Sequence, residues 1–518
     1  MMPSASDLSL AMDPSWLGSR AGFQPAPEAD WKSALRSDCR SVPWTALTAS
    51  RDAGSRPSWR AGWLVLLITV LGLVSPAAWA LADEPAARLA DRFGGDLGLV
   101  RQATGHFRVE EISGRWWVVT PEGHGMVLLG VNHLSEMKNA AVHARTLFAQ
   151  RFGQDWPRVF AEVERQCRAW GFNSAGFEAP KEMRATMPYI ISTPFMAASF
   201  WQEPLAYADV FAPAFAAAAE ERAVAVAGEM KANPMALAWC WTDSTSWDLE
   251  FTRRTRGTDY VSFLRELPAE APGRQRYTAF LRERHGGDLA RLNAAYGTAF
   301  PSFESVGGAG LDRDRAAVFA DDRAFLRLIA RRYYEAIAMP FRREHPAGLL
   351  VGDRFHFRDH PDEVLEEAAK FIDVLALQPG DHFFPPLEKL TRPDETWFDA
   401  AEFDRLHRLT GKPVIIADHQ CGFFDPQTPK TGGWFQYATV GEAVASYDRF
   451  LRDAFARPYV IGYFRCQYLT IYKDNIKRHK QGLLRPDGTP FEDYVREIAT
   501  THRAVLRALP DARPASGL

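Results

Sequence analysis

Residues 126–132 read MVLLGVN, a short apolar run that ends on the amide side chain of Asn132. Seven later runs have the same character: FNSAGF (172–177), YIISTPF (189–195), MALAWCW (235–241), LLVGDRF (349–355), IDVLALQ (372–378), PVIIAD (413–418) and VIGYFRC (460–466). Stretches such as 156–171 and 444–458 lie between them, with apolar residues at the three- and four-residue spacing of an amphipathic helix. Short apolar runs that alternate with helices indicate β/α units on a parallel sheet. Eight such units predict an α/β fold, a (β/α)8 TIM barrel over residues 126–510.

Two regions depart from this repeat. RWWVVTPEGHGMVLLGV (115–131) has the pattern of a strand hairpin that turns at Pro121-Glu122-Gly123, so residues 83–125 are expected to form an N-terminal strand element. About 100 residues separate the fourth and fifth runs and carry helical patterns such as DYVSFLREL and LARLNAAYG. We expect a helical insertion over about 250–345 that covers part of the barrel mouth.

The composition excludes several classes of partner. The 518 residues have a formal net charge of -3, which argues against a basic nucleic-acid surface or an acidic tail. No GxGxxG follows a strand run, and GxxxxGK[ST], GxSxG and HExxH are absent from the sequence, so no cofactor is expected. Aromatic residues make up 12%, with 16 Trp, a content that suits either core packing or stacking on sugar rings.

The N-terminal region resembles an export signal. Residues 61–82 carry no charged side chain, follow Arg51, Arg56 and Arg60, and end on small residues that fit A-x-A cleavage. We expect a signal peptide at 60–82 and a periplasmic or secreted protein, with 1–59 either a wrongly chosen start or a disordered tail. An uncleaved membrane anchor is the alternative, because 22 uncharged residues can span a bilayer.

Function in a TIM barrel resides on the loops that follow the strands. Asp418 is the leading candidate, because a charged residue at the end of an apolar strand has to be paired, solvated or functional. Asp243 is the second candidate, with capping of the next turn as its alternative role. Further polar and aromatic residues near the run ends are expected to contact substrate: Asn132, His133, Asn173, Glu178, Trp241, Ser244, Arg354, His382, His419, Trp434 and Tyr468. Several of these have structural alternatives: loop-holding hydrogen bonds for the asparagines, core packing for the aromatics, and an ion pair with Asp353 for Arg354.

Several stretches are similar to one group of enzymes. GRWWVVTPEGHGMVLLGVNHL from Gly114, YTAFLRERHGGDLARLNAAYGTAF from Tyr277 and GKPVIIADHQCGF from Gly411 are the clearest. The sequence resembles the agarase and β-galactosidase-like branch of the clan A glycoside hydrolases, which are retaining enzymes with a TIM-barrel catalytic domain. The resemblance implies cleavage of a β-glycosidic bond by two carboxylates, an acid/base after the fourth strand and a nucleophile at the end of the seventh.

The sequence departs from that pattern at both positions. Alignment on Trp247 places Ser244 at the acid/base position, and a shift of one residue places Asp243 there, while Asp418 replaces the nucleophilic Glu. Asp is one methylene shorter than Glu, so a wider gap between the carboxylates and an inverting mechanism become possible. If Ser244 replaces the acid, His419 or Glu178 is an alternative proton donor.

The sequence therefore predicts an exported glycoside hydrolase that uses Asp418 and Asp243 on a β-linked, galactoside- or agarose-like oligo- or polysaccharide. A catalytically silent glycan-binding barrel is the first alternative. A metal-dependent hydrolase is the second, with His382, Asp418, His419, Cys421 and Cys466 as conceivable ligands. These ligands have no close-spaced pairs, so no metal site is expected.

Overall fold

The computed structural model describes residues 89–196, 198–199, 202, 204–243, 245–307, 311–356, 360–379, 398–427, 436–473 and 478–510. The expected tail at 1–59 and signal peptide at 60–82 lie outside these ranges. Within them, every helix is too short or too polar to cross a bilayer.

A curled sheet of seven parallel strands forms the centre of the fold. Its strand order is β5-β13-β10-β9-β8-β7-β6, and every neighbouring pair is parallel. The strands are β5 (Leu128–Val131), β6 (Tyr189–Ser192), β7 (Ala236–Asp243), β8 (Leu349–His356), β9 (Leu375–Gln378), β10 (Val414–His419) and β13 (Val460–Arg465). These strands coincide with seven of the eight predicted runs. They are almost continuously buried, as expected of a parallel sheet covered on both faces.

The remaining predicted run, residues 172–177, is not a regular strand. It makes one parallel bridge to β5, between Gly130 and Ser174, and one to β6, between Phe177 and Ile190. Backbone hydrogen bonds accompany both bridges, from Asn173 N–H to Leu129 C=O (2.8 Å) and from Ile190 N–H to Gly176 C=O (2.9 Å). The segment therefore contacts both edge strands of the seven-stranded sheet.

A separate four-stranded antiparallel sheet precedes the parallel one, in the order β1-β4-β3-β2. It consists of β1 (Asp96–Val100), β2 (Arg108–Ile112), β3 (Arg115–Val119) and β4 (His124–Met126). Strands β3 and β4 form the predicted hairpin, with Val118 opposite Met126. Gly123, in the turn, has φ 90°, a conformation that favours glycine, and an added Cβ would lie 2.3 Å from the Arg101 carbonyl oxygen.

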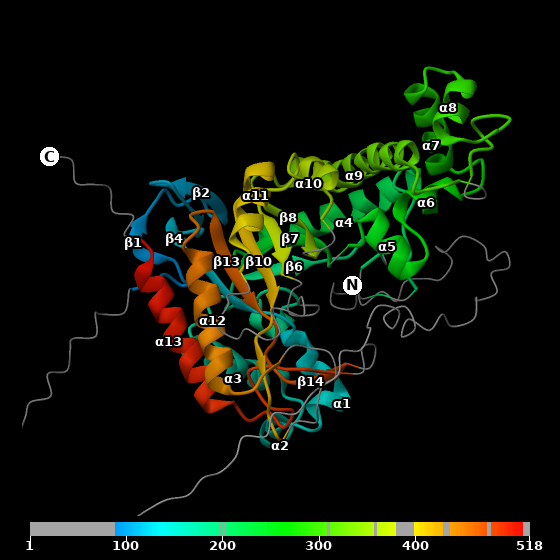
Figure 1. The fold of residues 1–518 in the computed structure, drawn as a ribbon. Coiled ribbons are helices and arrows are strands. Elements are labelled where there is room, and N and C mark those ends of the chain that lie inside the picture. The colour runs from blue at the N-terminus through cyan, green and yellow to red at the C-terminus, as the bar shows by residue number, and fades with distance from the viewer. Residues whose placement is uncertain are drawn as a thin grey trace, which may run out of the picture. The chain divides into compact units, whose positions relative to one another are not determined.

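Helices cover the flanks of the parallel sheet. Figure 1 shows α4 (Pro213–Ala232), α9 (Ala316–Glu344) and α10 (Asp362–Ala368) along one flank, and α3 (Trp156–Ala169), α12 (Val440–Phe455) and α13 (Glu492–Ala508) along another. Helix α11 (Ala400–Thr410) packs beside α10. The smaller elements are η2 (Leu134–Lys138), α1 (Ala140–His143), α2 (Leu147–Phe152), η3 (Lys181–Met183), β11 (Gly422–Phe423), β12 (Gln436–Tyr437), β14 (Ile471–Lys473) and β15 (Arg478–Lys480).

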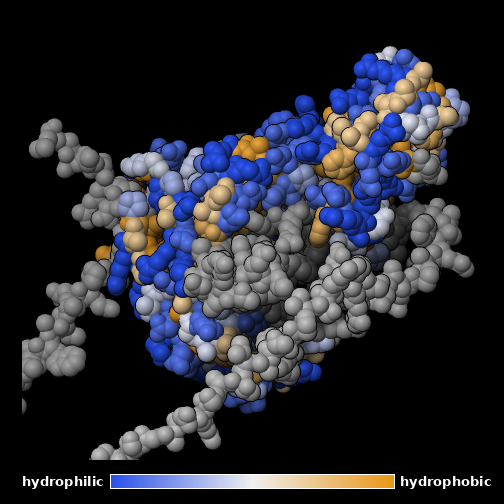
Figure 2. Space-filling view, in the orientation of Figure 1, coloured by the Kyte–Doolittle hydropathy of each residue, from blue (hydrophilic) through white to orange (hydrophobic). Residues whose placement is uncertain are grey.

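The expected insertion between the fourth and fifth runs is helical. It contains α5 (Leu249–Arg256), α6 (Tyr260–Arg265), α7 (Pro272–Arg284) and α8 (Leu289–Tyr296), and it ends with the long helix α9. Figure 1 shows α6, α7 and α8 at the end of α9 that lies far from the four-stranded sheet. Over the described residues the face in Figure 2 is mainly hydrophilic, with scattered apolar patches.

Candidate active site

The carboxyl ends of three adjacent strands, β5, β13 and β10, meet at one edge of the parallel sheet. The Asn132 N–H donates to the Arg465 carbonyl (2.9 Å), and the Cys466 N–H donates to the His419 carbonyl (2.9 Å). These two bonds extend the ladders by one residue past the strands and place Asn132, Asp418 and Cys466 side by side. Parallel strands bring their carboxyl ends to one edge, which is where such folds place their sites.

Asp418 is held in this edge by the amide side chains of Asn132, which follows β5, and of Gln378, which ends β9. Asn132 Nδ2 donates to the Ala417 carbonyl (2.7 Å) and to Asp418 Oδ1 (3.4 Å), and Gln378 Nε2 donates to Asp418 Oδ2 (3.4 Å). The Asp418 side chain is 6% exposed. A nearly buried carboxylate with two amide donors has a fixed orientation. An imidazole also lies beside it.

That imidazole belongs to His133, which lies between two carboxylates. His133 Nε2 is 3.7 Å from Asp418 Oδ2, and His133 Nδ1 is 2.8 Å from Glu178 Oε2. His133 and Glu178 both have positive φ, 61° and 60°, a left-handed conformation that costs energy in residues other than glycine. Two strained residues in contact beside a buried carboxylate are typical of a functional site.

Asp243 ends β7 and forms an ion pair across to β8. Arg354 Nη2 lies 2.5 Å from Asp243 Oδ2, and the Arg354 guanidinium is 4.7 Å from the centre of the Phe177 ring. Burial by itself lowers the pKa of Arg354. The carboxylates of Asp243, Asp418 and Glu178 outweigh this effect and raise the pKa of Arg354 above its usual value. One guanidinium therefore interacts electrostatically with three carboxylates of the site.

Asp353 does not pair with Arg354, which was one of the predicted roles. Successive strand residues point to opposite faces, so Asp353 faces α9 while Arg354 faces Asp243. The Asp353 carboxylate accepts hydrogen bonds from Tyr333 (3.0 Å), Tyr334 (2.8 Å) and the Trp247 indole (3.0 Å). Burial raises the pKa of Asp353 to about 6, and these hydrogen bonds counter the rise. Asp353 thus fixes β8 against α9 and the loop after β7.

Trp241 and Tyr468 have the contacts of core side chains. Trp241 is buried among the rings of Phe195, Trp239, Tyr333 and Tyr334, at centroid distances of 5.2 to 6.4 Å. The Tyr468 hydroxyl donates to Gln166 of α3 at 2.9 Å, and its ring lies beside Trp170. The structure therefore does not bring either residue to Asp418.

Two polar residues of the predicted set have structural contacts as well. Asn173 accepts from the Leu129 N–H (2.8 Å) and donates to the Val127 carbonyl (2.9 Å), so its amide binds the backbone of β5. His419 Nδ1 bonds the Tyr463 hydroxyl (2.9 Å), and its ring stacks on Phe450 of α12 at 3.9 Å. His419 thus faces away from Asp418, which is its neighbour in the strand.

The structure brings together Asn132, His133, Glu178, Asp243, Arg354 and Asp418 of the predicted residues. Ser244, His382 and Trp434 lie outside the described residues. Two residues of the edge were absent from the predicted catalytic and substrate-binding residues: Gln378, and Cys466, which was named only as a conceivable metal ligand. Both end an apolar strand run, and this position was the signal that could have included them.

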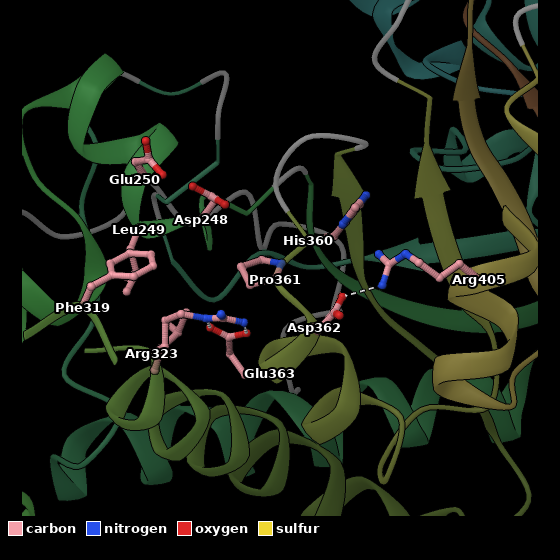
Figure 3. Close-up of a pocket in the computed structure, with 11 residues that line it drawn as sticks. Asp248, Leu249, Glu250, Phe319, Arg323, His360, Pro361, Asp362, Glu363 and Arg405 are labelled. Carbon is pink, nitrogen blue, oxygen red and sulfur yellow. Dashed lines mark hydrogen bonds and ion pairs between the residues drawn. The ribbon is translucent and has the colours of Figure 1, made fainter. Parts of the chain in front are cut away.

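A cavity of about 340 Å³ lies beside α5, α9, α10 and α11. Figure 3 shows paired charges along its wall: Arg323 beside Glu363, and Arg405 bonded to Asp362 at 2.8 Å. Phe319 and His360 also line it, and the six residues of the predicted set named above do not. The cavity is therefore distinct from the edge that holds Asp418.

No established protein-family profile matches this chain. The chain is nevertheless similar in sequence to a β-agarase and in fold to agarases and to a β-galactosidase, the class of glycoside hydrolases that the sequence resembles.

By sequence, it is 24% identical over 332 residues to Beta-agarase A of Vibrio sp. (strain JT0107), a match that covers 59% of this chain and 31% of the agarase. By structure, it matches the agarase AgWH50C (TM-score 0.67, 18% identity, 82% of this chain and 68% of that one) and an exo-beta-agarase (TM-score 0.67, 19% identity, 80% and 67%). The chain thus spans about a third of the curated relative's length.

Proposed function

We propose that this chain hydrolyses a β-glycosidic bond in a galactoside- or agarose-like glycan, with Asp418 as the nucleophile or general base. The observation that carries the proposal is the position of Asp418: a nearly buried carboxylate, held by Asn132 and Gln378, at the carboxyl edge of a sheet whose fold is similar to that of agarases. Glycoside hydrolysis needs one ionised carboxylate of this kind and one proton donor.

For the proton donor we propose Asp243, with Glu178 as the second candidate. Asp243 is in an ion pair with Arg354, and it has to leave that pair before it can donate a proton. Glu178 is 41% exposed and bonded to His133, so a substrate can reach it directly. Asn132, His133 and Arg354 would then contact or orient the sugar. The contacts of His419 with Tyr463 and Phe450 argue against it as the donor.

We further propose that residues 172–177 close the seven-stranded sheet into an eight-membered barrel. The two parallel bridges of this segment, to β5 and to β6, support closure. Export through residues 60–82 also belongs to the proposal, and it rests on the sequence pattern alone.

The test is turnover of a panel of aryl β- and α-glycosides and agarose oligosaccharides by the wild type, Asp418→Asn, Asp243→Asn and Glu178→Gln. Loss of a general acid or base typically lowers the rate by about 10² to 10⁴. A donor is needed most where the leaving group is poor, so the donor variant should lose more activity on oligosaccharides than on activated aryl glycosides. Wild-type enzyme without turnover of any β-glycoside would refute hydrolysis.

The Asp243–Arg354 ion pair also favours a second candidate, a glycan-binding barrel without catalysis. In that case Asp243 is a structural partner of Arg354, and the carboxylates serve as acceptors for sugar hydroxyl groups. Calorimetric binding of agarose oligosaccharides without hydrolysis by the wild type would support this candidate.

A further inference from the structure

Three side chains at the shared edge of β5, β13 and β10 have the chemistry of metal ligands. His133, Asp418 and Cys466 each offer one ligand atom, and these atoms all lie within 4.8 Å of one another. The three residues lie at the carboxyl ends of adjacent strands, and backbone hydrogen bonds between those strand ends hold their spacing. Imidazole, carboxylate and thiolate are the ligand types that zinc accepts in proteins.

The distance between His133 and Asp418 fits a small tetrahedral ion. Zinc binds His nitrogen at about 2.0–2.1 Å and carboxylate oxygen at about 2.0–2.2 Å, so two such ligands lie roughly 3.3–3.5 Å apart in a tetrahedron. His133 Nε2 and Asp418 Oδ2 are 3.7 Å apart, close to this spacing. Three protein ligands leave the fourth position open, as in zinc sites that bind water or substrate.

An independent observation concerns the other side of the imidazole. His133 Nδ1 lies 2.8 Å from Glu178 Oε2, and a neutral ring that donates to this carboxylate from Nδ1 has its lone pair on Nε2, the nitrogen nearest Asp418. A carboxylate on the second nitrogen is the usual support of a metal-bound histidine. Asn132 and Gln378 support Asp418 in the same way, through bonds to its two oxygens.

The charges around the edge permit a divalent cation. Arg354 on β8 interacts electrostatically with Asp418, and it is in an ion pair with Asp243. Arg465, which precedes Cys466, donates to the carbonyls of His419, Cys421 and Cys466. Its guanidinium is therefore directed at backbone oxygens.

We propose that His133, Asp418 and Cys466 bind one zinc-class divalent cation, with Glu178 as the supporting carboxylate. Cation binding at this site is independent of the proposed function. The effect of the cation on activity rests on the proposed function, in which Asp418 attacks the sugar. A cation bound to Asp418 occupies the lone pair that makes this attack, so zinc inhibits the hydrolase.

The experiment uses the full chain after treatment with a chelator. Zinc is titrated by calorimetry, and cobalt(II) is titrated by absorption spectroscopy, in which a thiolate-to-cobalt charge-transfer band reports the cysteine ligand. We expect one ion per chain, at least a 100-fold weaker affinity in Cys466→Ser, and about 10- to 100-fold weaker affinity in Glu178→Gln. Cys167→Ser is the matched control, because Cys167 is a buried thiol on α3, and it should bind zinc as the wild type does.

His133→Asn provides a second test if Cys466→Ser does not fold, since asparagine tolerates the positive φ of His133. This variant should also lose at least 100-fold in affinity. Equal affinity in wild type, Cys466→Ser and His133→Asn, or no binding by the wild type, would overturn the site. Activity separates the two proposals: metal-free enzyme that is active and is inhibited by zinc supports both. Activity that needs zinc supports the site and refutes Asp418 as the nucleophile.

Discussion

Arg354 on β8 and Asp243 on β7 form an ion pair of 2.5 Å, in which the guanidinium is 2% exposed and the carboxylate 33%. The pair joins the ends of the adjacent strands β7 and β8. The sequence had predicted Asp243 as a proton donor, and Arg354 as a substrate contact or a structural partner of Asp353. A single contact thus links the candidate acid to the charge that also interacts with Asp418 and Glu178.

Asp243→Asn is expected to destabilise the protein, because it leaves a buried guanidinium without its nearest carboxylate. Breaking a fully buried pair costs about 3–5 kcal/mol, and the partial exposure of Asp243 reduces the expected loss to about 2 kcal/mol. Urea unfolding measures the change. Asp314→Asn is the control, since it breaks the exposed pair with Arg253 and should cost less than about 0.5 kcal/mol. Equal losses in the two variants would show that the Asp243 pair contributes no more than a surface pair.

Asp418→Asn is expected to lower kcat on any glycoside that the wild type hydrolyses by about 10² to 10⁴. Asparagine keeps the size of the side chain but cannot act as a nucleophile or a base. Steady-state kinetics provide the measurement, with thermal unfolding to establish that the variant folds. Asp448→Asn on α12, which breaks a surface pair with Arg452, should retain wild-type kcat. A kcat of Asp418→Asn within threefold of wild type would exclude Asp418 from the reaction.

Trp241→Phe should leave KM unchanged and lower the stability by about 1–2 kcal/mol. The reason is that Trp241 is buried between β7 and α9 and packs against other aromatic rings. Steady-state kinetics on the best substrate measure KM, and the midpoint of urea unfolding measures the stability. A severalfold rise in KM with unchanged stability would instead place Trp241 in a sugar subsite.

His502 on α13 is expected to make the stability depend on pH. Its Nδ1 donates to the Trp170 carbonyl (2.9 Å), and its Nε2 accepts from the Tyr447 hydroxyl (2.7 Å), so the ring is neutral. Burial lowers the pKa of His502 to about 4, against a usual value of 6.5. The unfolded chain therefore binds a proton first, and about 3 kcal/mol of stability is lost as the pH falls from about 6.5 to 4.

Unfolding free energies of the wild type and His502→Gln across this pH range test the effect. The variant should show a shallower loss of stability toward low pH. Tyr447→Phe retains the imidazole and should keep the pH dependence. Parallel wild-type and His502→Gln curves would exclude this role of His502.

Much of the fold was predictable from local pattern. The apolar runs became β5, β6, β7, β8, β9, β10 and β13, because a strand buried on both faces requires continuous apolar residues. The hairpin at Pro121–Gly123 followed from its turn residues, and the helical insertion from its spacing. The run at 172–177 was predicted as a strand, but the Asn173 side chain takes the place of regular backbone pairing with β5.

The sequence by itself determined which residues stand at strand ends, and so it identified Asp418, Asp243, His133 and Glu178 as candidates. Tertiary structure decided which of these side chains meet. Alternation along a strand sends Asp418 toward His133 but His419 toward Phe450, and Arg354 toward Asp243 but Asp353 toward Tyr334. A one-residue difference reverses the direction of a side chain, and its partners come from strands far away in the chain. The contacts between side chains on different strands of the sheet therefore define the site. The order of residues in the sequence does not determine these contacts.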